Sequence, residues 1–371
     1  MKNRIAIWGA GKFGKYIFAQ LKKQYDNCIV CFVDKNDNLI GQKIQNVEII
    51  KPERLQSEEF QIDYLLISFT DGIDIYDQLL KFENIKVGII KNRVFNQQLD
   101  VKDNLNVDRN IFWVKQRNKP LLKYLETNIV DYCNLNCKGC SHFSNLFNVG
   151  DMISFDSYCK DLELISNHVN LFQYRMLGGE ILLNDRLIDY IKITRELLPN
   201  TEIWIVTNGI LIPKQKEELF HQCKQNEIGI EISEYNPTTY LKDSIIESLK
   251  KYNIDFRFTE KINTFGKNID IRGHADKFNA MKNCREHICH FFREGKIYKC
   301  PFEALGNKFF AHFELNIKLS GGIDIYDKEL NWDKLIYQLE NEPVEACKYC
   351  GNEIQYKWSV SNSPTMSDWT I

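Results

Sequence analysis

The chain has 371 residues, of which 44% are hydrophobic and 12% aromatic, so it can form folded cores and is not intrinsically disordered. Its 48 lysines and arginines nearly balance 50 aspartates and glutamates, and the net charge of -2 favours neither nucleic acid nor an anionic membrane surface as a partner. The first residues lack the pattern of a signal peptide, and no apolar run approaches the length of a membrane span. We therefore expect a cytoplasmic protein.

Residues 1–93 predict a Rossmann-like nucleotide-binding domain, because buried strands alternate with helices as in a parallel sheet. Strands are predicted at 4–8, 28–33, 64–69 and 85–90. Gly9, Gly11 and Gly14 follow the first strand and open a helix, and Asp34 ends the second strand. This is the context of a dinucleotide fingerprint, in which glycines admit a phosphate and the acid meets a ribose. A bound nucleotide or nucleotide-sugar, bound NAD and a ligand-free scaffold all stay open.

The rest of the chain predicts a linker and two further domains, again of the α/β class. Residues 94–124 lose the alternation and are predicted as the linker. Residues 125–275 resume it, with strands at 126–131, 172–177, 202–207, 228–233 and 254–259 and helices between them. Residues 276–371 break into short pieces around five cysteines and predict a small cysteine-rich domain.

Eight of the twelve cysteines fall into two groups, and short spacings in a reducing compartment favour metal or cluster binding over disulfides. Cys133, Cys137 and Cys140 form a C-x3-C-x2-C loop directly after a predicted strand. A four-iron cluster needs four ligands to be closed, so three thiolates would leave one iron open to an outside ligand. Zinc is the alternative, although structural zinc normally takes four protein ligands.

This loop resembles the signature of radical S-adenosylmethionine (SAM) enzymes. The resemblance implies a partial (β/α)6 barrel, a four-iron cluster on the three cysteines, and SAM bound at the open iron. It also implies an electron donor such as flavodoxin or ferredoxin, reductive cleavage of SAM, and a 5′-deoxyadenosyl radical that abstracts hydrogen from a substrate. The sequence departs from the family at Gly139, where an aromatic residue is usual, and we expect Tyr132 or Phe143 to compensate.

Polar motifs follow the next three predicted strands. Gly178, Gly179 and Glu180 end the second strand, Asn208 the third and Ser233 the fourth. A Gly-Gly-Glu motif alone is more often a turn, but a carboxylate at a strand end can also pair with an ammonium group. In their order after the cysteine loop the motifs are similar to those that hold the amino group, ribose and carboxylate of SAM in the superfamily.

The second cysteine group comprises Cys284, Cys289, Cys300, Cys347 and Cys350. A hairpin around a glycine, ending in a cysteine, followed later by C-x2-C, resembles the twitch domain, a shortened SPASM extension that binds an auxiliary iron–sulfur cluster. The resemblance implies that Cys300, Cys347 and Cys350 are ligands and that the fourth is Cys284 or Cys289, which the sequence does not decide. A four-cysteine zinc knuckle is the alternative.

The function that these resemblances imply is a radical SAM enzyme acting on a carbohydrate or nucleotide-sugar in polysaccharide or related biosynthesis. The N-terminal domain resembles Rossmann-like domains attached to sugar-modifying enzymes, which supports that substrate class. Maturation of a ribosomal peptide is the second possibility, and a non-enzymatic, zinc-stabilised nucleotide-binding protein is the third. An NAD-dependent dehydrogenase ranks last because it leaves eight clustered cysteines unused. The pattern assigns no acid or base to the reaction and does not define its outcome.

Overall fold

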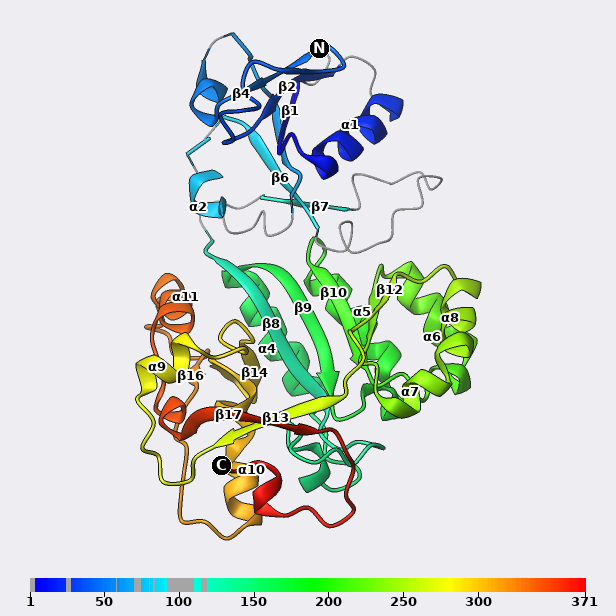
Figure 1. Cartoon of the computed structure of the whole chain (residues 1–371), viewed down its shortest axis with the longest axis vertical. Coiled ribbons are helices and arrows are strands. Elements are labelled where there is room, and N and C mark those ends of the chain that lie inside the picture. Colours follow the sequence, from blue (N-terminus) through cyan, green and yellow to red (C-terminus); the bar gives the residue numbers. More distant parts are fainter. Residues whose placement is uncertain are drawn as a thin grey trace. The chain divides into compact units, whose positions relative to one another are not determined.

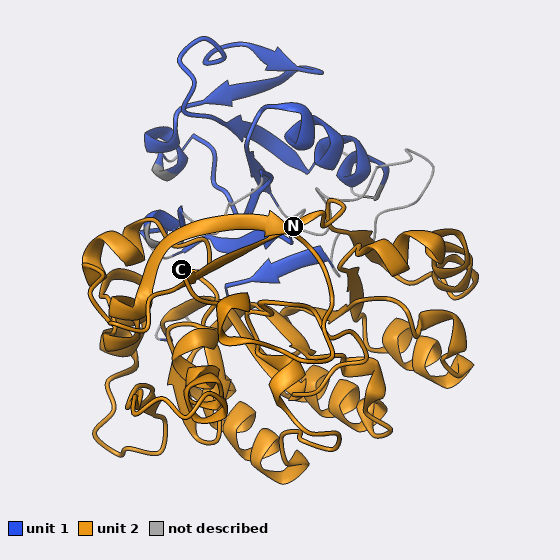
Figure 2. Ribbon diagram, turned by 60° about the horizontal axis from the view of Figure 1, so that its bottom comes forward, with its two compact units in different colours: residues 1–119 blue, residues 120–371 orange. Residues whose placement is uncertain are grey.

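The computed structural model describes residues 4–24, 28–57, 59–69, 75–79, 81–82, 84–91, 110–114 and 119–371. The chain divides into two compact units, residues 1–119 and 120–371 (Figure 2). Both units are of the predicted α/β class, with parallel strands at the centre of each main sheet. Among the described helices, none is both long enough and apolar enough to cross a bilayer.

The first unit is built on a sheet whose described strands run in the order β3-β4-β2-β1-β5-β6-β7 (Figure 1). Its elements are β1 (Ile5–Trp8), α1 (Lys12–Gln24), β2 (Ile29–Val33), β3 (Lys43–Ile44), β4 (Val47–Ile50), β5 (Tyr64–Ile67), α2 (Tyr76–Leu79), β6 (Lys86–Ile90) and β7 (Ile111–Trp113). The strands β4, β2, β1, β5 and β6 are parallel, which confirms the predicted parallel sheet, although β4 was not among the predicted strands. With β1 at the centre, this is the strand order of a doubly wound nucleotide-binding sheet.

The linker predicted at 94–124 is wrong at its C-terminal end. Residues 111–113 form β7, which pairs antiparallel with β6 because its Ile111 and Phe112 side chains are buried in the first unit. The next strand begins at Leu121, inside the predicted linker, and the boundary between the units falls at Lys119. The predicted domain limit at 93 lies outside the described residues.

The second unit contains a sheet with the described order β12-β11-β10-β9-β8-β14-β15-β16 and a separate two-stranded sheet, β13-β17. Its strands are β8 (Leu121–Val130), β9 (Asn170–Gly178), β10 (Glu202–Thr207), β11 (Gly229–Ile232), β12 (Phe256–Phe258), β13 (Thr264–Ile269), β14 (Phe291–Arg293), β15 (Lys296–Tyr298), β16 (Ile323–Asp324) and β17 (Cys350–Lys357). Its helices are α4 (Phe155–His168), α5 (Leu187–Leu197), α6 (Glu217–Gln225), α7 (Asn236–Tyr240), α8 (Lys242–Lys251), α9 (Lys277–Lys282), α10 (Pro301–His312) and α11 (Trp332–Asn341).

The boundary predicted at 275/276 does not separate two bodies, because both sheets of the second unit cross it. β14 pairs parallel with β8 through Phe291 and Glu126, and β17 pairs antiparallel with β13. Of the six strands expected for the partial barrel, the described residues supply five, β8 to β12, in sequential parallel order. The cysteine-rich hairpin β14-β15 takes the position beside β8.

The main core of the second unit lies on one face of this sheet. Alternate strand residues such as Tyr174, Ile203 and Ile230 pack against α4, α5, α6 and α8, because successive side chains of a strand point to opposite faces. The other face carries polar and charged side chains. The loops at the carboxyl ends of β8 to β11 therefore leave the sheet together, where ligands bind in α/β folds.

Candidate functional site

The loop after β8 brings Cys133, Cys137 and Cys140 together. Their sulfurs lie close enough that Cys140 and Cys137 add to the effect of burial in raising the pKa of the Cys133 thiol. Leu135 and Trp358 form the apolar side of this group of thiols. Among the described residues, no group of three or more His, Cys, Asp or Glu side chains has the arrangement needed to hold a single metal ion.

Two of the three sulfurs accept a hydrogen bond from nitrogen. The backbone N–H of Leu135 donates to Cys133 Sγ at 3.3 Å, and the indole N–H of Trp358 donates to Cys137 Sγ at 3.3 Å. Burial, with Cys140 nearby, raises the pKa of Cys137 to about 12, and the bond from Trp358 opposes the shift. Burial thus favours the protonated form of Cys133 and Cys137, and a bound cation would favour their thiolates.

Two glycines bring the end of β9 against the cysteine loop. A Cβ at Gly178 would lie 1.9 Å from the Val130 carbonyl oxygen, and one at Gly179 would lie 2.1 Å from the Tyr132 carbonyl oxygen. Because neither glycine has a side chain, the two backbones can approach and form hydrogen bonds. Gly179 N–H donates to Val130 O at 2.8 Å, and Glu180 N–H donates to Tyr132 O at 3.0 Å. The Gly-Gly pair is therefore required for close backbone approach, not only for a turn.

The Glu180 carboxylate is hydrogen-bonded inside the protein. It is 0% exposed and accepts hydrogen bonds from Thr207 Oγ1 at 2.6 Å, Asn208 N at 2.9 Å and Leu182 N at 3.0 Å. Burial raises its pKa, and these three donors oppose the shift. Glu180 thus fixes the loops after β9 and β10 relative to each other, and its pairing with an ammonium group stays a prediction.

Asn208 and Ser233 lie at the ends of β10 and β11. The Asn208 amide nitrogen donates to Asn134 Oδ1 at 2.7 Å and lies 3.8 Å from Cys133 Sγ, so this residue does reach the cysteine loop. Ser233 is half-buried and its backbone N–H donates to Thr207 O at 2.9 Å. Two residues further on, burial and the three thiols raise the pKa of Tyr235 well above its usual value, which places the Tyr235 hydroxyl beside them.

Gly139 has a structural role that the sequence did not indicate. Its φ is +62°, and a Cβ there would lie 2.1 Å from the Tyr356 hydroxyl oxygen, which donates to Lys138 O at 2.7 Å. The aromatic group beside this position thus comes from β17. Phe143, which we expected to compensate, is 1% exposed and packs in another core with Trp369.

Four cysteines of the C-terminal group neighbour one another. Burial and then Cys350 raise the pKa of Cys300, and burial followed by Cys347 and Cys284 raises that of Cys350. For Cys289 the raised pKa comes from burial and then from Glu126 and Glu286, with Cys284 the weakest of the named neighbours. Cys284 is therefore better placed than Cys289 to complete the group.

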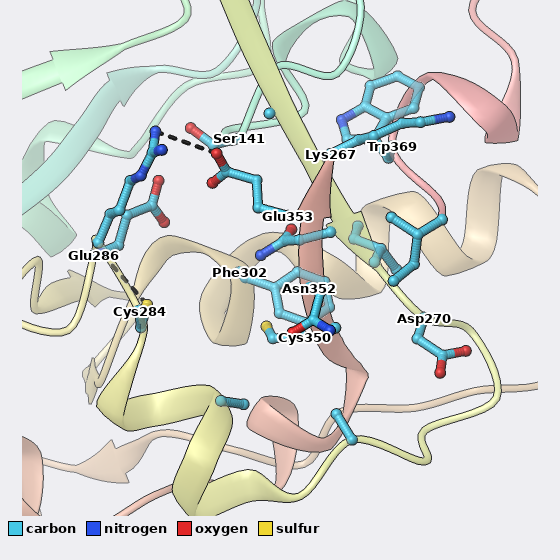
Figure 3. Close-up of a pocket in the computed structure, with 18 of the residues that line it drawn as sticks. Ser141, Lys267, Asp270, Cys284, Glu286, Phe302, Cys350, Asn352, Glu353 and Trp369 are labelled. Atoms are coloured by element: carbon cyan, nitrogen blue, oxygen red, sulfur yellow. Dashed lines mark hydrogen bonds and ion pairs between the residues drawn. The ribbon is translucent and has the colours of Figure 1, made fainter. Parts of the chain in front are cut away.

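A cavity of about 930 Å³ lies beside the second cysteine group and also reaches the residues on either side of Cys140. Cys284, Cys300 and Cys350 line it together with Gly139 and Ser141 of the first loop. Figure 3 shows acidic, amide and basic side chains along its wall, with the rings of Phe302 and Trp369. The labelled polar residues are Ser141, Lys267, Asp270, Glu286, Asn352 and Glu353. The volume is in the range of small-molecule sites.

The glycine loop of the first unit has the geometry of a phosphate loop. Gly9 has φ +115°, and a Cβ at Gly14 would lie 1.7 Å from the Gly9 carbonyl oxygen, so both are needed for the tight turn and for helix packing. A Cβ at Gly11 would meet nothing within 4 Å, which leaves the backbone there open. Asp34 accepts from Ala10 N at 2.9 Å and holds the loop.

Sequence reasoning missed a network of charged side chains on the main sheet of the second unit, on the face opposite its main core. Arg175 and Arg257 both pair with Glu231, and Tyr124 donates to Glu126, which burial gives a pKa of about 8. These residues come from four different strands. The sequence shows these charged residues within otherwise apolar strands. No local pattern indicates that their side chains contact one another in the fold.

Comparison with known proteins adds partial matches. A family model described as C2185-like, N-terminal, matches residues 1–95. Two curated relatives are named GTP 3′,8-cyclase. The one from Petrotoga mobilis is 27% identical over 121 residues, 32% of this chain and 37% of the relative. The one from Thermodesulfovibrio yellowstonii is 29% identical over 124 residues, 33% of this chain and 34% of the relative. The chain thus spans little more than a third of these relatives.

Among solved structures, BtrN in complex with AdoMet and 2-DOIA matches with a TM-score of 0.41 and 14% identity, covering 68% of this chain and 99% of that one. Native anSMEcpe with bound AdoMet and the Cp18Cys peptide matches with a TM-score of 0.30 and 20% identity, covering 38% of this chain and 42% of that one.

Over about a third of its length the chain is similar in sequence to the curated relatives, and this similarity together with the cysteine loop supports a radical SAM enzyme. A four-iron cluster and SAM are the cofactors of that superfamily.

Proposed function

We propose that this protein is a radical SAM enzyme acting on a carbohydrate or nucleotide-sugar. The observation that carries the proposal is the convergence of Cys133, Cys137 and Cys140 with the loops after β9 and β10. The donor set fits a four-iron cluster with one open iron, since three cysteine sulfurs gather in one loop. When bound, the cluster and SAM supply the reductive formation of a 5′-deoxyadenosyl radical.

In this proposal the chain's own residues position the cofactors and exclude water. Cys133, Cys137 and Cys140 hold the cluster, with Leu135 and Trp358 forming the apolar side of the site. Glu180 and Asn208 fix the loops against which SAM lies, through the bonds to Leu182, Thr207 and Asn134. A fixed, largely dry site leaves the difficult chemistry to the cofactor, as is usual for cofactor enzymes.

The second cysteine group is proposed to hold an auxiliary four-iron cluster on Cys284, Cys300, Cys347 and Cys350. Lys299 supports this assignment: burial lowers its pKa, and Cys347, Cys300 and Cys284 oppose the shift. A cation beside thiolates favours their charged form. Such a centre would lie at the wall of the cavity, which Cys284, Cys300 and Cys350 line.

The substrate class rests on the cavity and on the first unit. Carboxylates, amides and a lysine beside two aromatic rings are groups that hydrogen-bond sugar hydroxyls and stack on sugar faces. The first unit offers an open glycine loop for a phosphate or nucleotide group. The curated relatives are named for a reaction of GTP, itself a ribose-containing nucleotide.

Anaerobic reconstitution tests the proposal. Purified protein should contain about eight irons and eight sulfides per chain, as two four-iron clusters require. After reduction by dithionite, flavodoxin or ferredoxin it should convert SAM to 5′-deoxyadenosine, and nucleotide-sugars should be consumed where ribosomal peptides are not. Stoichiometric zinc without iron would instead support a non-enzymatic nucleotide-binding protein.

A further inference from the structure

The C-terminal segment, residues 356–369, holds the cysteine loop from outside the sheet. Its backbone pairs with the loop: Ser359 O accepts from Lys138 N at 3.0 Å and Ser361 N donates to Asn136 O at 2.8 Å. Tyr356 donates to Lys138 O at 2.7 Å. This segment begins with the last two residues of β17, the strand whose first residue is Cys350. The loop that carries Cys137 is thus positioned by residues more than 200 positions away in sequence.

Two tryptophans of this segment donate to the cysteine loop in chemically different ways. Trp358 Nε1 donates to Cys137 Sγ at 3.3 Å, and Trp369 Nε1 donates to Cys140 O at 2.9 Å. One bond therefore ends on a sulfur and the other on a backbone carbonyl. Cys133 accepts from the Leu135 backbone at 3.3 Å and, at 3.8 Å, from the Asn208 amide nitrogen, which also donates to Asn134. Trp358 is the side chain that donates to a sulfur at 3.3 Å, and a phenylalanine in its place removes this N–H.

The Trp358 indole is fixed in place. It is 9% exposed, its ring lies 5.3 Å from that of Tyr235, and its backbone N–H donates to Asn263 O at 2.9 Å. The N–H dipole thus points at Cys137 Sγ in a largely water-free environment, where such a dipole acts more strongly than in water.

We propose that Trp358 is a positioning residue that raises the reduction potential of the cluster on Cys133, Cys137 and Cys140 through its hydrogen bond to Cys137 Sγ. This rests on the proposed function. When the cluster accepts one electron from an external reductant such as dithionite, negative charge on its sulfurs increases, and a fixed N–H donor stabilises that reduced state. Hydrogen bonds to the sulfurs are among the factors that set cluster potentials.

The test is a redox titration of full-length protein monitored by electron paramagnetic resonance, with the SAM-dependent change in the spectrum identifying the cluster of the first loop. Trp358→Phe keeps the ring against Tyr235 and removes the donor. At the wild-type midpoint its ratio of reduced to oxidised cluster should fall by about three- to tenfold, tenfold being about 59 mV for a one-electron couple. Trp369→Phe is the matched control, because it removes a bond to a carbonyl, and its midpoint should equal that of the wild type.

An unchanged midpoint in Trp358→Phe with full iron content would overturn this inference and leave the proposed function intact. A wild-type protein without any SAM-responsive iron signal would overturn both. If Trp358→Phe fails to load iron, wild-type protein labelled with ¹⁵N-tryptophan tests whether an indole N–H is hydrogen-bonded to the cluster. Its reduced cluster should show coupling to one indole nitrogen, and the absence of coupling would contradict the hydrogen bond.

Discussion

Asp131 and Arg293 form a bidentate ion pair that joins the start of the cysteine loop to the C-terminal hairpin. Arg293 Nη1 and Nη2 lie 2.7 and 2.8 Å from the two carboxylate oxygens, and the Asp131 side chain is 1% exposed. Asn128 donates to the same carboxylate at 3.2 Å. One buried carboxylate, two residues before Cys133, thus connects the cluster loop to the strand β14 that was expected to belong to another domain.

Removing Arg293 should lower the free energy of unfolding. Arg293→Ala leaves the Asp131 carboxylate buried without its cation, which typically costs about 3–5 kcal/mol. Urea denaturation followed by circular dichroism measures this. Arg272→Ala is the control, since Arg272 pairs with Asp270 but is 68% exposed, and exposed pairs contribute about 0–1 kcal/mol. Equal losses in the two variants would contradict a structural role for the Asp131 pair.

Glu126 should make stability fall as pH rises. Its pKa is about 8 in the folded protein because burial outweighs the bond from Tyr124 and the charge of Arg175, whereas its ordinary value is 4.5. Between these values the folded state binds the proton and the unfolded state does not, so the free energy of unfolding decreases from about pH 4.5 to about pH 8. Glu126→Gln keeps an acceptor for Tyr124 and should lose this dependence. Parallel pH profiles of wild type and variant would show that Glu126 is ionised in both states.

The fourth ligand of the auxiliary centre can be assigned by comparing two single substitutions. Cys284→Ala should lower the iron content from about eight to about four per chain, because one four-iron cluster loses a ligand. Cys289→Ala should retain about eight, since Cys289 lies beside Glu126 and Glu286. Iron analysis after anaerobic reconstitution distinguishes them. The reverse pattern would assign Cys289 as the ligand and contradict the grouping of Cys284 with Cys347 and Cys350.

Glu180→Gln should weaken both folding and SAM binding. An amide nitrogen cannot accept a hydrogen bond, so either orientation of Gln leaves at least one of the three donors without an acceptor. The expected loss is about 1–3 kcal/mol in the free energy of unfolding. Calorimetry with SAM should show reduced affinity, because Asn208 is no longer fixed. Glu218→Gln, on the exposed surface of α6, should change neither, and a Glu180 variant that behaved like it would remove Glu180 from the site.

The sequence predicted the parts of the fold that follow from local pattern. Strand positions were correct for β9 to β11 and for the carboxyl end of β8, because period-two burial and glycines act over a few residues. The features that the sequence did not predict depend on partners far away in the chain. They are β7 within the predicted linker, the pairing of β14 with β8, and the hydrogen bonds from Thr207 and Asn208 to the Glu180 carboxylate. No local signal identifies a partner strand or hydrogen bond so far along the chain.

The choice between Cys284 and Cys289 was beyond the sequence for the same reason. The two thiols are five positions apart and precede the same hairpin. Only the packing of α9 and β17 decides which one faces Cys347 and Cys350. Trp358 was likewise not singled out, since it follows a half-exposed strand and its partner, Cys137, lies more than 200 residues earlier.

The most direct test of the central claim is the formation of 5′-deoxyadenosine from SAM by anaerobically reconstituted, reduced protein, measured by chromatography for wild type and Cys137→Ala. We expect the nucleoside from the wild type and none from the variant, whose iron content should fall from about eight to about four as one four-iron cluster is lost. Cys347→Ala/Cys350→Ala should also retain about four irons but should still cleave SAM. Wild-type amounts of 5′-deoxyadenosine from Cys137→Ala would contradict a cluster on Cys133, Cys137 and Cys140.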